Sequence, residues 1–398
     1  MSTFIVEAMM RLPLRAVLPL LCACAGDAPR TAVAPDTLMI DGMPVLHHDA
    51  TALERAPQWT VDTISPTIID GDGDSRFNLL GASFIAALPD GRFLASRTGN
   101  LLLVFDSTGA PLARHWISVQ SGLFSPPLLL PPDTLLSASY RNPPSGSPDD
   151  ALVARHAVVQ LAVLEDGTVL RQPMAAASPP CTTVKGRLPG AELLVQTVCA
   201  VADSGVGDGW LWARASRADR RLAVLESLFT FPAAEIVTDT GALGWVAPQF
   251  GARGHLAVWG EWIVSATSDR YQLDLRGHDG RVQARLRVDR PREPVTEAIR
   301  AAAPRLRQQR ARFSDSLPAF AALQVDHEGL LWVIDYRTRG DSGWSATAFR
   351  SDGAVVGRLR GTGAGRPVWL TRERVWIEEP PPAPLTPWFS ARRVVPVR

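Results

Sequence analysis

The first residues that could bind a ligand are three aspartates at alternate positions, Asp70, Asp72 and Asp74. Carboxylates at positions one, three and five resemble the first half of a calcium-binding loop. The twelfth position of this loop would be Gly81, where calcium loops have a bidentate glutamate. Because repeated Asp-Gly pairs are also the ordinary composition of a tight turn, we expect turn chemistry here and keep calcium as the alternative. No other cofactor is predicted.

A second candidate site consists of Asp335 and Tyr336, which end the apolar run Trp332-Val333-Ile334. At the end of an inner strand these two side chains would lie at the mouth of a central channel. The alternative is that Asp335 caps its own turn. The seven histidines are spread along the chain, and no HExxH, CxxC or G-x-S-x-G motif occurs, so the common zinc and serine hydrolase signatures are missing.

The elements that must position these residues are short apolar or alternating runs closed by acidic-glycine turns. Residues 321–361 contain four such runs, with turns at Glu328-Gly329 and Asp352-Gly353. The same pattern recurs clearly over residues 83–116 and 254–288, and more weakly over residues 124–174 and 181–227. A repeated meander of four antiparallel strands predicts a β-propeller.

Six blades account for residues 57–398. The last blade has only three strands, within residues 367–397, and the run Trp59–Ile69 is left over at the other end. We expect this run to be the fourth strand, so that the N- and C-terminal strands close the ring. Residues 229–252 fit no blade and are assigned as a connecting excursion. The expected fold is an all-β, six-bladed β-propeller of four-stranded antiparallel blades with one short helical insertion.

The helical insertion is expected at about residues 294–313, and Pro304 interrupts it. It carries five arginines, Arg300, Arg305, Arg307, Arg310 and Arg312. A solvated insertion is one interpretation of this segment. The other is a basic docking surface for a partner protein or an anionic lipid.

Residues 1–24 have the pattern of an export signal, because Arg11 and Arg15 accompany a short apolar stretch and small residues before a cysteine. The sequence Leu21-Cys22-Ala23-Cys24 resembles the lipobox of bacterial lipoproteins, which would make Cys24 the lipidated residue; an ordinary secretory signal is the alternative. Residues 25–56 are expected to be a flexible tether. In an oxidising compartment, Cys181 and Cys199 would bracket a hairpin and form a structural disulfide.

Composition adds few functional constraints. The net charge of +1 gives no reason to expect nucleic acid as a partner. The basic residues are almost all arginine, and we interpret Lys185, the sole lysine, as a result of nucleotide composition.

The order of turns within a blade resembles that of the NHL and TolB-like six-bladed propellers. The matching residues are Asp90-Gly91 with Phe105-Asp106, Asp279-Gly280, and Glu328-Gly329 with Trp332-Val333-Ile334-Asp335 and Asp352-Gly353. More narrowly, the chain looks like the six-bladed propeller lipoproteins of environmental bacteria. The resemblance implies blade geometry rather than an activity. Some six-bladed relatives are calcium-dependent lactonases whose ion is held by Glu and Asn side chains, and this chain has only three Asn.

The sequence therefore predicts a monomeric, lipid-anchored propeller of the bacterial cell envelope, on the periplasmic or outer-membrane surface. We expect it to be a binding or scaffold module for an envelope protein or a ligand rather than an enzyme. The alternative is a lactonase-like, metal-dependent hydrolase with its site in the central channel.

Overall fold

The structure is a computed structural model, and the residues that it describes belong to one compact unit, Thr31–Arg398. They are residues 31–64, 66–69, 79, 82–88, 90–97, 101–116, 122–123, 128–130, 134–141, 155–163, 169–175, 182–198, 209–238, 245–303, 312–338, 341–379 and 388–397.

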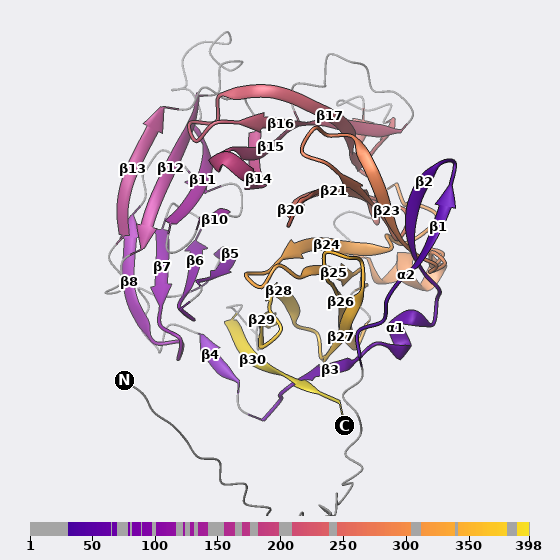
Figure 1. Ribbon diagram of the computed structural model, residues 1–398. Helices are drawn as coiled ribbons and strands as arrows, with labels where there is room; N and C mark the ends of the chain where they lie inside the picture. Colours follow the sequence, from indigo (N-terminus) through magenta and orange to yellow (C-terminus); the bar gives the residue numbers. More distant parts are fainter. Residues whose placement is uncertain are drawn as a thin grey trace, which may run out of the picture. The chain divides into compact units, whose positions relative to one another are not determined.

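Within these residues nearly all regular structure is β-strand, and strands that follow one another in sequence pair into four-stranded antiparallel sheets (Figure 1). The first sheet contains β5 (Ala82–Ala87), β6 (Phe93–Arg97), β7 (Leu101–Phe105) and β8 (Pro111–Trp116). The second contains β10 (Leu128–Leu130), β11 (Thr134–Arg141), β12 (Arg155–Val163) and β13 (Val169–Ala175), with β9 (Gly122–Leu123) beside β11. The third contains β14 (Thr182–Arg187), β15 (Leu193–Thr197), β16 (Trp210–Ala218) and β17 (Val224–Glu235).

The C-terminal half continues the same pattern. One meander contains β20 (Gly254–Trp259), β21 (Trp262–Thr267), β22 (Gln272–Arg276) and β23 (Val282–Val288). The next contains β24 (Phe320–Val325), β25 (Leu331–Asp335), β26 (Gly343–Phe349) and β27 (Val355–Thr362). The last contains β28 (Arg366–Leu370), β29 (Arg374–Glu379) and β30 (Trp388–Pro396). A separate short hairpin consists of β18 (Val237–Thr238) and β19 (Trp245–Val246).

The acidic-glycine turns are where the sequence predicts them. Gly329 and Gly353 have φ angles of +80° and +83°, which glycine adopts without a steric penalty. At the first of these turns the Oδ1 atom of Asp326 accepts hydrogen bonds from the backbone N–H groups of Glu328 and Leu330. Asp326 thus satisfies backbone donors of the turn, which explains the aspartate three residues before Gly329.

The two ends of the compact unit pair with each other, as the sequence predicts. Strand β4 (Thr67–Ile69) lies antiparallel to β30 and is the fourth strand of the C-terminal sheet. Strand β3 (Gln58–Val61) also lies antiparallel to β30, and on its other side it runs parallel to β27. Residues near both ends of the sequence therefore complete one sheet.

Neighbouring sheets contact each other through their first strands. Strand β20 contacts β14 on one side and β24 on the other. Between β24 and β28, the side chain of Gln324 donates to the backbone oxygen of Leu370 at 2.7 Å and accepts from its N–H at 3.0 Å. Consecutive four-stranded meanders joined in this way are the organisation of a β-propeller, so the predicted fold class is confirmed.

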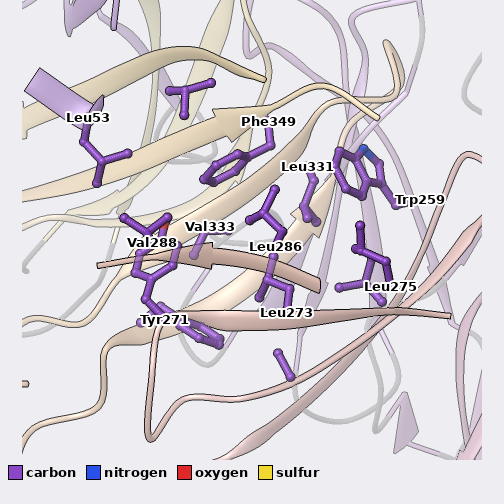
Figure 2. Packing of buried hydrophobic residues seen from close by; sticks show 14 of the residues in the cluster. Leu53, Trp259, Tyr271, Leu273, Leu275, Leu286, Val288, Leu331, Val333 and Phe349 are labelled. Carbon is purple, nitrogen blue, oxygen red and sulfur yellow. The ribbon is translucent and has the colours of Figure 1, made fainter. Parts of the chain in front are cut away.

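Residues 36–56 differ from the flexible tether that the sequence predicts. Strands β1 (Asp36–Ile40) and β2 (Met43–His48) form a hairpin, β2 runs parallel to β23, and the helix α1 (Ala52–Arg55) follows. Leu53 is 3% exposed and lies in the same apolar cluster as Phe349 (Figure 2). The signal that reveals the hairpin is Asp41-Gly42, whose φ angles of +52° and +76° are typical of a two-residue hairpin turn.

Two other boundaries also differ from expectation. The helix α2 covers only Glu297–Ala302 of the expected insertion, and Thr296 caps it by accepting a hydrogen bond from the N–H of Ile299. Residues 304–311 lie outside the described residues. The expected excursion at 229–252 begins as regular structure, because β17 continues to Glu235 opposite β16.

Candidate functional site

Several predicted site residues lie outside the described part of the chain: Cys24, Asp70, Asp72, Asp74, Cys181, Cys199, Arg305, Arg307 and Arg310. Of the basic insertion, Arg300 and Arg312 are described. The guanidinium of Arg300 lies 3.9 Å from the carboxylate of Glu297, one turn earlier in α2. The predicted lipid attachment, disulfide, calcium loop and docking surface therefore stay predictions.

The carboxylate of Asp335 is buried in an ion-pair cluster instead of lying at an open mouth. Asp335 is only 4% exposed. Its Oδ1 atom lies 2.8 Å from Nη1 of Arg290, and its Oδ2 atom lies 3.1 Å from Nη2 of Arg358 and accepts a hydrogen bond from Ser345. Arg290 follows β23, whereas Ser345 and Arg358 belong to β26 and β27, so the cluster joins two neighbouring sheets. Because its oxygens are engaged internally, we interpret Asp335 as a structural residue.

Lys185, which the sequence analysis attributed to composition, occupies a specialised position in β14. Val184 pairs with Val195 and Gly186 pairs with Leu194, so Lys185 is the extra residue of a β-bulge. Bulges redirect a side chain and often occur beside functional sites. Burial lowers the pKa of the Lys185 ammonium. Among the described residues no hydrogen bond or ion pair compensates this charge.

The neighbouring first strand places a second basic side chain beside Lys185. His255 lies in β20, and its Nε2 atom is buried without a hydrogen-bond partner among the described residues. Burial, together with the charges of Lys185 and Arg253, lowers the pKa of His255 to about 4. Strands β14 and β20 can approach closely because residue 186 is a glycine. A Cβ atom there would lie 2.4 Å from the side chain of Val258.

Arg253 immediately precedes β20 and completes what we call the basic group: Lys185, Arg253 and His255. Its backbone is fixed, because its N–H donates to Oγ of the buried Ser268 at 2.9 Å and its carbonyl oxygen accepts from the N–H of Ser268 at 2.9 Å. Arg253 is exposed, and its guanidinium forms no ion pair within the described ranges. A carboxylate does lie next to this backbone, because Oε2 of Glu235 accepts hydrogen bonds from the N–H of Ala252 at 2.9 Å and from the hydroxyl of Ser314 at 3.0 Å.

Three aromatic side chains, Phe250, Phe313 and Tyr336, form what we call the aromatic group. The ring centroids of Phe250 and Phe313 are 5.9 Å apart, and Tyr336 meets Phe250 edge-on at 6.4 Å. All three residues are partly exposed. Burial raises the pKa of Tyr336, whereas the nearby charge of Arg253 lowers it. Arg253 follows Phe250 by only three residues, so the basic and aromatic groups share one stretch of backbone.

The backbone of the aromatic group is strained and held in place. Phe250 has a φ angle of +62°, a conformation that costs a bulky residue about 1–3 kcal/mol. The N–H of Gln249 donates to the carbonyl oxygen of Arg312 at 2.6 Å, and the N–H of Ser314 donates to the carbonyl oxygen of Gln249 at 3.1 Å. Strain that the surrounding structure maintains is characteristic of ligand-binding positions.

Together the basic and aromatic groups can hold an anion beside an apolar surface. The described residues contain no cluster of three or more His, Cys, Asp or Glu side chains that could hold a metal ion. No helix within them is long and apolar enough to cross a membrane. Of these six residues the sequence analysis named only Tyr336 as a candidate, and its role stays a prediction; the one available signal for the others was that Lys185 is the sole lysine.

Comparison with known proteins adds little to this description. No protein-family model matches the chain, and no curated protein matches it. Among solved structures, the chain is similar to one described as the structure of U3-55K, with a TM-score of 0.42 and 10% identity, covering 85% of this chain and 100% of that chain. It is also similar to the crystal structure of BamB from Moraxella catarrhalis, with a TM-score of 0.30 and 11% identity, covering 77% of this chain and 81% of that one.

Proposed function

We propose that this propeller is a binding module and that the basic and aromatic groups form its ligand site. The observation that carries the proposal is the uncompensated charge of Lys185. A desolvated ammonium is unfavourable unless it is paired, yet Lys185 has no hydrogen bond or ion pair among the described residues, and its charge acts on the basic side chain of His255. A bound anion would supply the missing partner.

The chemistry of this site favours binding over metal-dependent hydrolysis. A catalytic metal needs several His, Asp or Glu ligands at one place. In the basic group His255 is the only residue of these types, and its neighbours Lys185 and Arg253 repel a cation. A ligand that carries negative charge is the chemistry that this arrangement supports.

We further propose that the propeller has six blades and that Cys24 anchors it to a membrane of the bacterial cell envelope as a monomer. The six successive meanders support the blade count, and the sequence Leu21-Cys22-Ala23-Cys24 supports the anchor. In a cell fractionation, Cys24→Ala should move the protein from the membrane to the soluble fraction. Equal membrane association of the variant and the wild type would contradict lipidation.

The binding function is tested by the small molecules that the full-length protein retains through purification, measured by native mass spectrometry before and after denaturation. Arg253→Gln should lose the retained ligand. Arg281→Gln is the matched control, because Arg281 has an 88% exposed side chain at a remote turn, and it should retain the ligand. Retention that is equal in both variants would show that this site is not the ligand site, and conversion of the ligand over time would show an enzyme.

A further inference from the structure

We infer that the ligand is a small aromatic carboxylate, with its carboxylate at the basic group and its ring at the aromatic group. This inference rests on the proposed function, because it takes the two groups to be one ligand site. It adds the chemical class of the ligand, which neither the fold nor the similar structures specify.

The basic group favours a carboxylate for three reasons. Lys185 supplies a point charge whose desolvation an anion would offset. Arg253 supplies a planar guanidinium without an ion pair in the described structure, and guanidinium groups bind carboxylates through two parallel hydrogen bonds. His255 supplies a buried Nε2 atom without a partner, which can donate a hydrogen bond in the neutral tautomer that carries its proton there.

The aromatic group favours an apolar ring on the same ligand. Phe250 already contacts Phe313 and Tyr336 through tilted and edge-on ring packing, and all three keep part of their surface exposed. An additional ring would pack against them in the same geometry. Phe250 and Arg253 are three residues apart, so their Cα atoms are separated by at most about 11 Å and the two ends of the site are adjacent.

Solvent reaches some surface of each residue of the basic and aromatic groups, although Nε2 of His255 is itself buried. Arg253 is exposed, and Lys185 and His255 are only partly covered. A ligand can therefore enter without unfolding a strand. The bulge at Lys185 and the strained Phe250 fix the two ends before the ligand arrives, so little ordering is required on binding.

The sole lysine makes a direct test straightforward. Full-length protein in detergent, grown with lysine labelled with carbon-13 at the ε position, should give one ε-carbon signal, that of Lys185. Titration with 2-naphthoate should shift this signal saturably with a Kd below about 1 mM. The pKa of Lys185 should rise on binding. The neutral isostere 2-naphthamide should leave the signal unchanged, and inorganic phosphate should bind about tenfold more weakly than naphthoate.

Variants separate the two ends of the site. Arg253→Gln should weaken naphthoate binding by about tenfold or more, because it removes a charge-assisted contact, whereas Arg281→Gln should have no effect. Tyr336→Ala should weaken naphthoate binding by about tenfold but leave acetate binding unchanged. Far-UV circular dichroism confirms that each variant is folded before its affinity is compared.

A Lys185 signal that naphthoate does not move would overturn the inference, and so would equal affinities for naphthoate and phosphate. These outcomes differ from failure of the proposed function. If Arg253→Gln loses a retained native ligand while naphthoate leaves Lys185 unaffected, the site is correct and the ligand class is wrong. If Arg253→Gln and Arg281→Gln retain the native ligand equally, the site itself is wrong.

Discussion

Replacing Leu53 by Ala tests whether residues 36–56 belong to the propeller, as the structure indicates, or form a flexible tether. Leu53 is 3% exposed and packs in a cluster with Phe349, Val355 and Val288 (Figure 2). The substitution removes three buried carbons, which corresponds to about 2.4 kcal/mol at about 0.8 kcal/mol for each carbon. The cavity left behind adds to this loss, and Leu→Ala substitutions in cores cost about 2–5 kcal/mol. We therefore expect the free energy of unfolding to fall by about 3 kcal/mol.

Equilibrium unfolding in urea, followed by circular dichroism, measures this change. The matched control is Leu38→Ala in β1, where the residue is 42% exposed and the expected effect is within about 0.5 kcal/mol. If Leu53→Ala were as harmless as Leu38→Ala, helix α1 would not be docked, and the packing argument for this segment would be refuted.

Three further predictions concern stability. Gly357→Ala should destabilise the fold by about 1–3 kcal/mol in urea titrations, because a Cβ atom there would lie 2.5 Å from the ring of Trp59; an unchanged midpoint would contradict this close contact. Asp335→Ala should cost about 3–5 kcal/mol, because it leaves two guanidinium groups without their shared carboxylate, and a loss below about 1 kcal/mol would show that the cluster is dispensable. The pKa of His255 is lowered in the folded protein. Its contribution to the free energy of unfolding is therefore fully present above pH 6.5 and is lost as the pH falls toward about 4. Between pH 7 and 4 the wild type should therefore lose up to about 3 kcal/mol more stability than His255→Gln, and parallel pH profiles would contradict the burial of His255.

The sequence predicted the meanders well because their signals are local. An acidic residue before glycine marks a turn whose conformation those residues prefer, and Glu328-Gly329 and Asp352-Gly353 are both turns in the structure. The pairing of the termini was also predictable, because the three C-terminal strands lacked a fourth.

The hairpin at 36–48 was missed for a different reason. Its strands are short, and β1 is exposed at every position, so no alternating apolar pattern marks it. What secures the hairpin is distant in sequence. His48 Nε2 donates to the carbonyl oxygen of Gly353 at 2.8 Å, and His47 Nε2 lies 2.9 Å from the carboxylate of Asp289.

The candidate site was largely unpredictable because four segments far apart in sequence build it. Lys185 reaches the site through a bulge in one sheet, Arg253 and His255 come from the next, and the aromatic group combines residues 250, 313 and 336. No local spacing connects these positions. Asp335 was predicted as a site residue from its place at a strand end, but that position does not reveal the arginines that enclose it.

The most direct test of the central claim is the pKa of Lys185 in the protein freed of ligand. A pH titration of the single ε-carbon signal measures it without interference from other lysines. The account predicts a pKa below the ordinary value of 10.5, because burial desolvates an ammonium that has no anionic partner in the described structure. A pKa at or above that value would show that the charge is already compensated or fully hydrated, and would contradict an open anion site at Lys185.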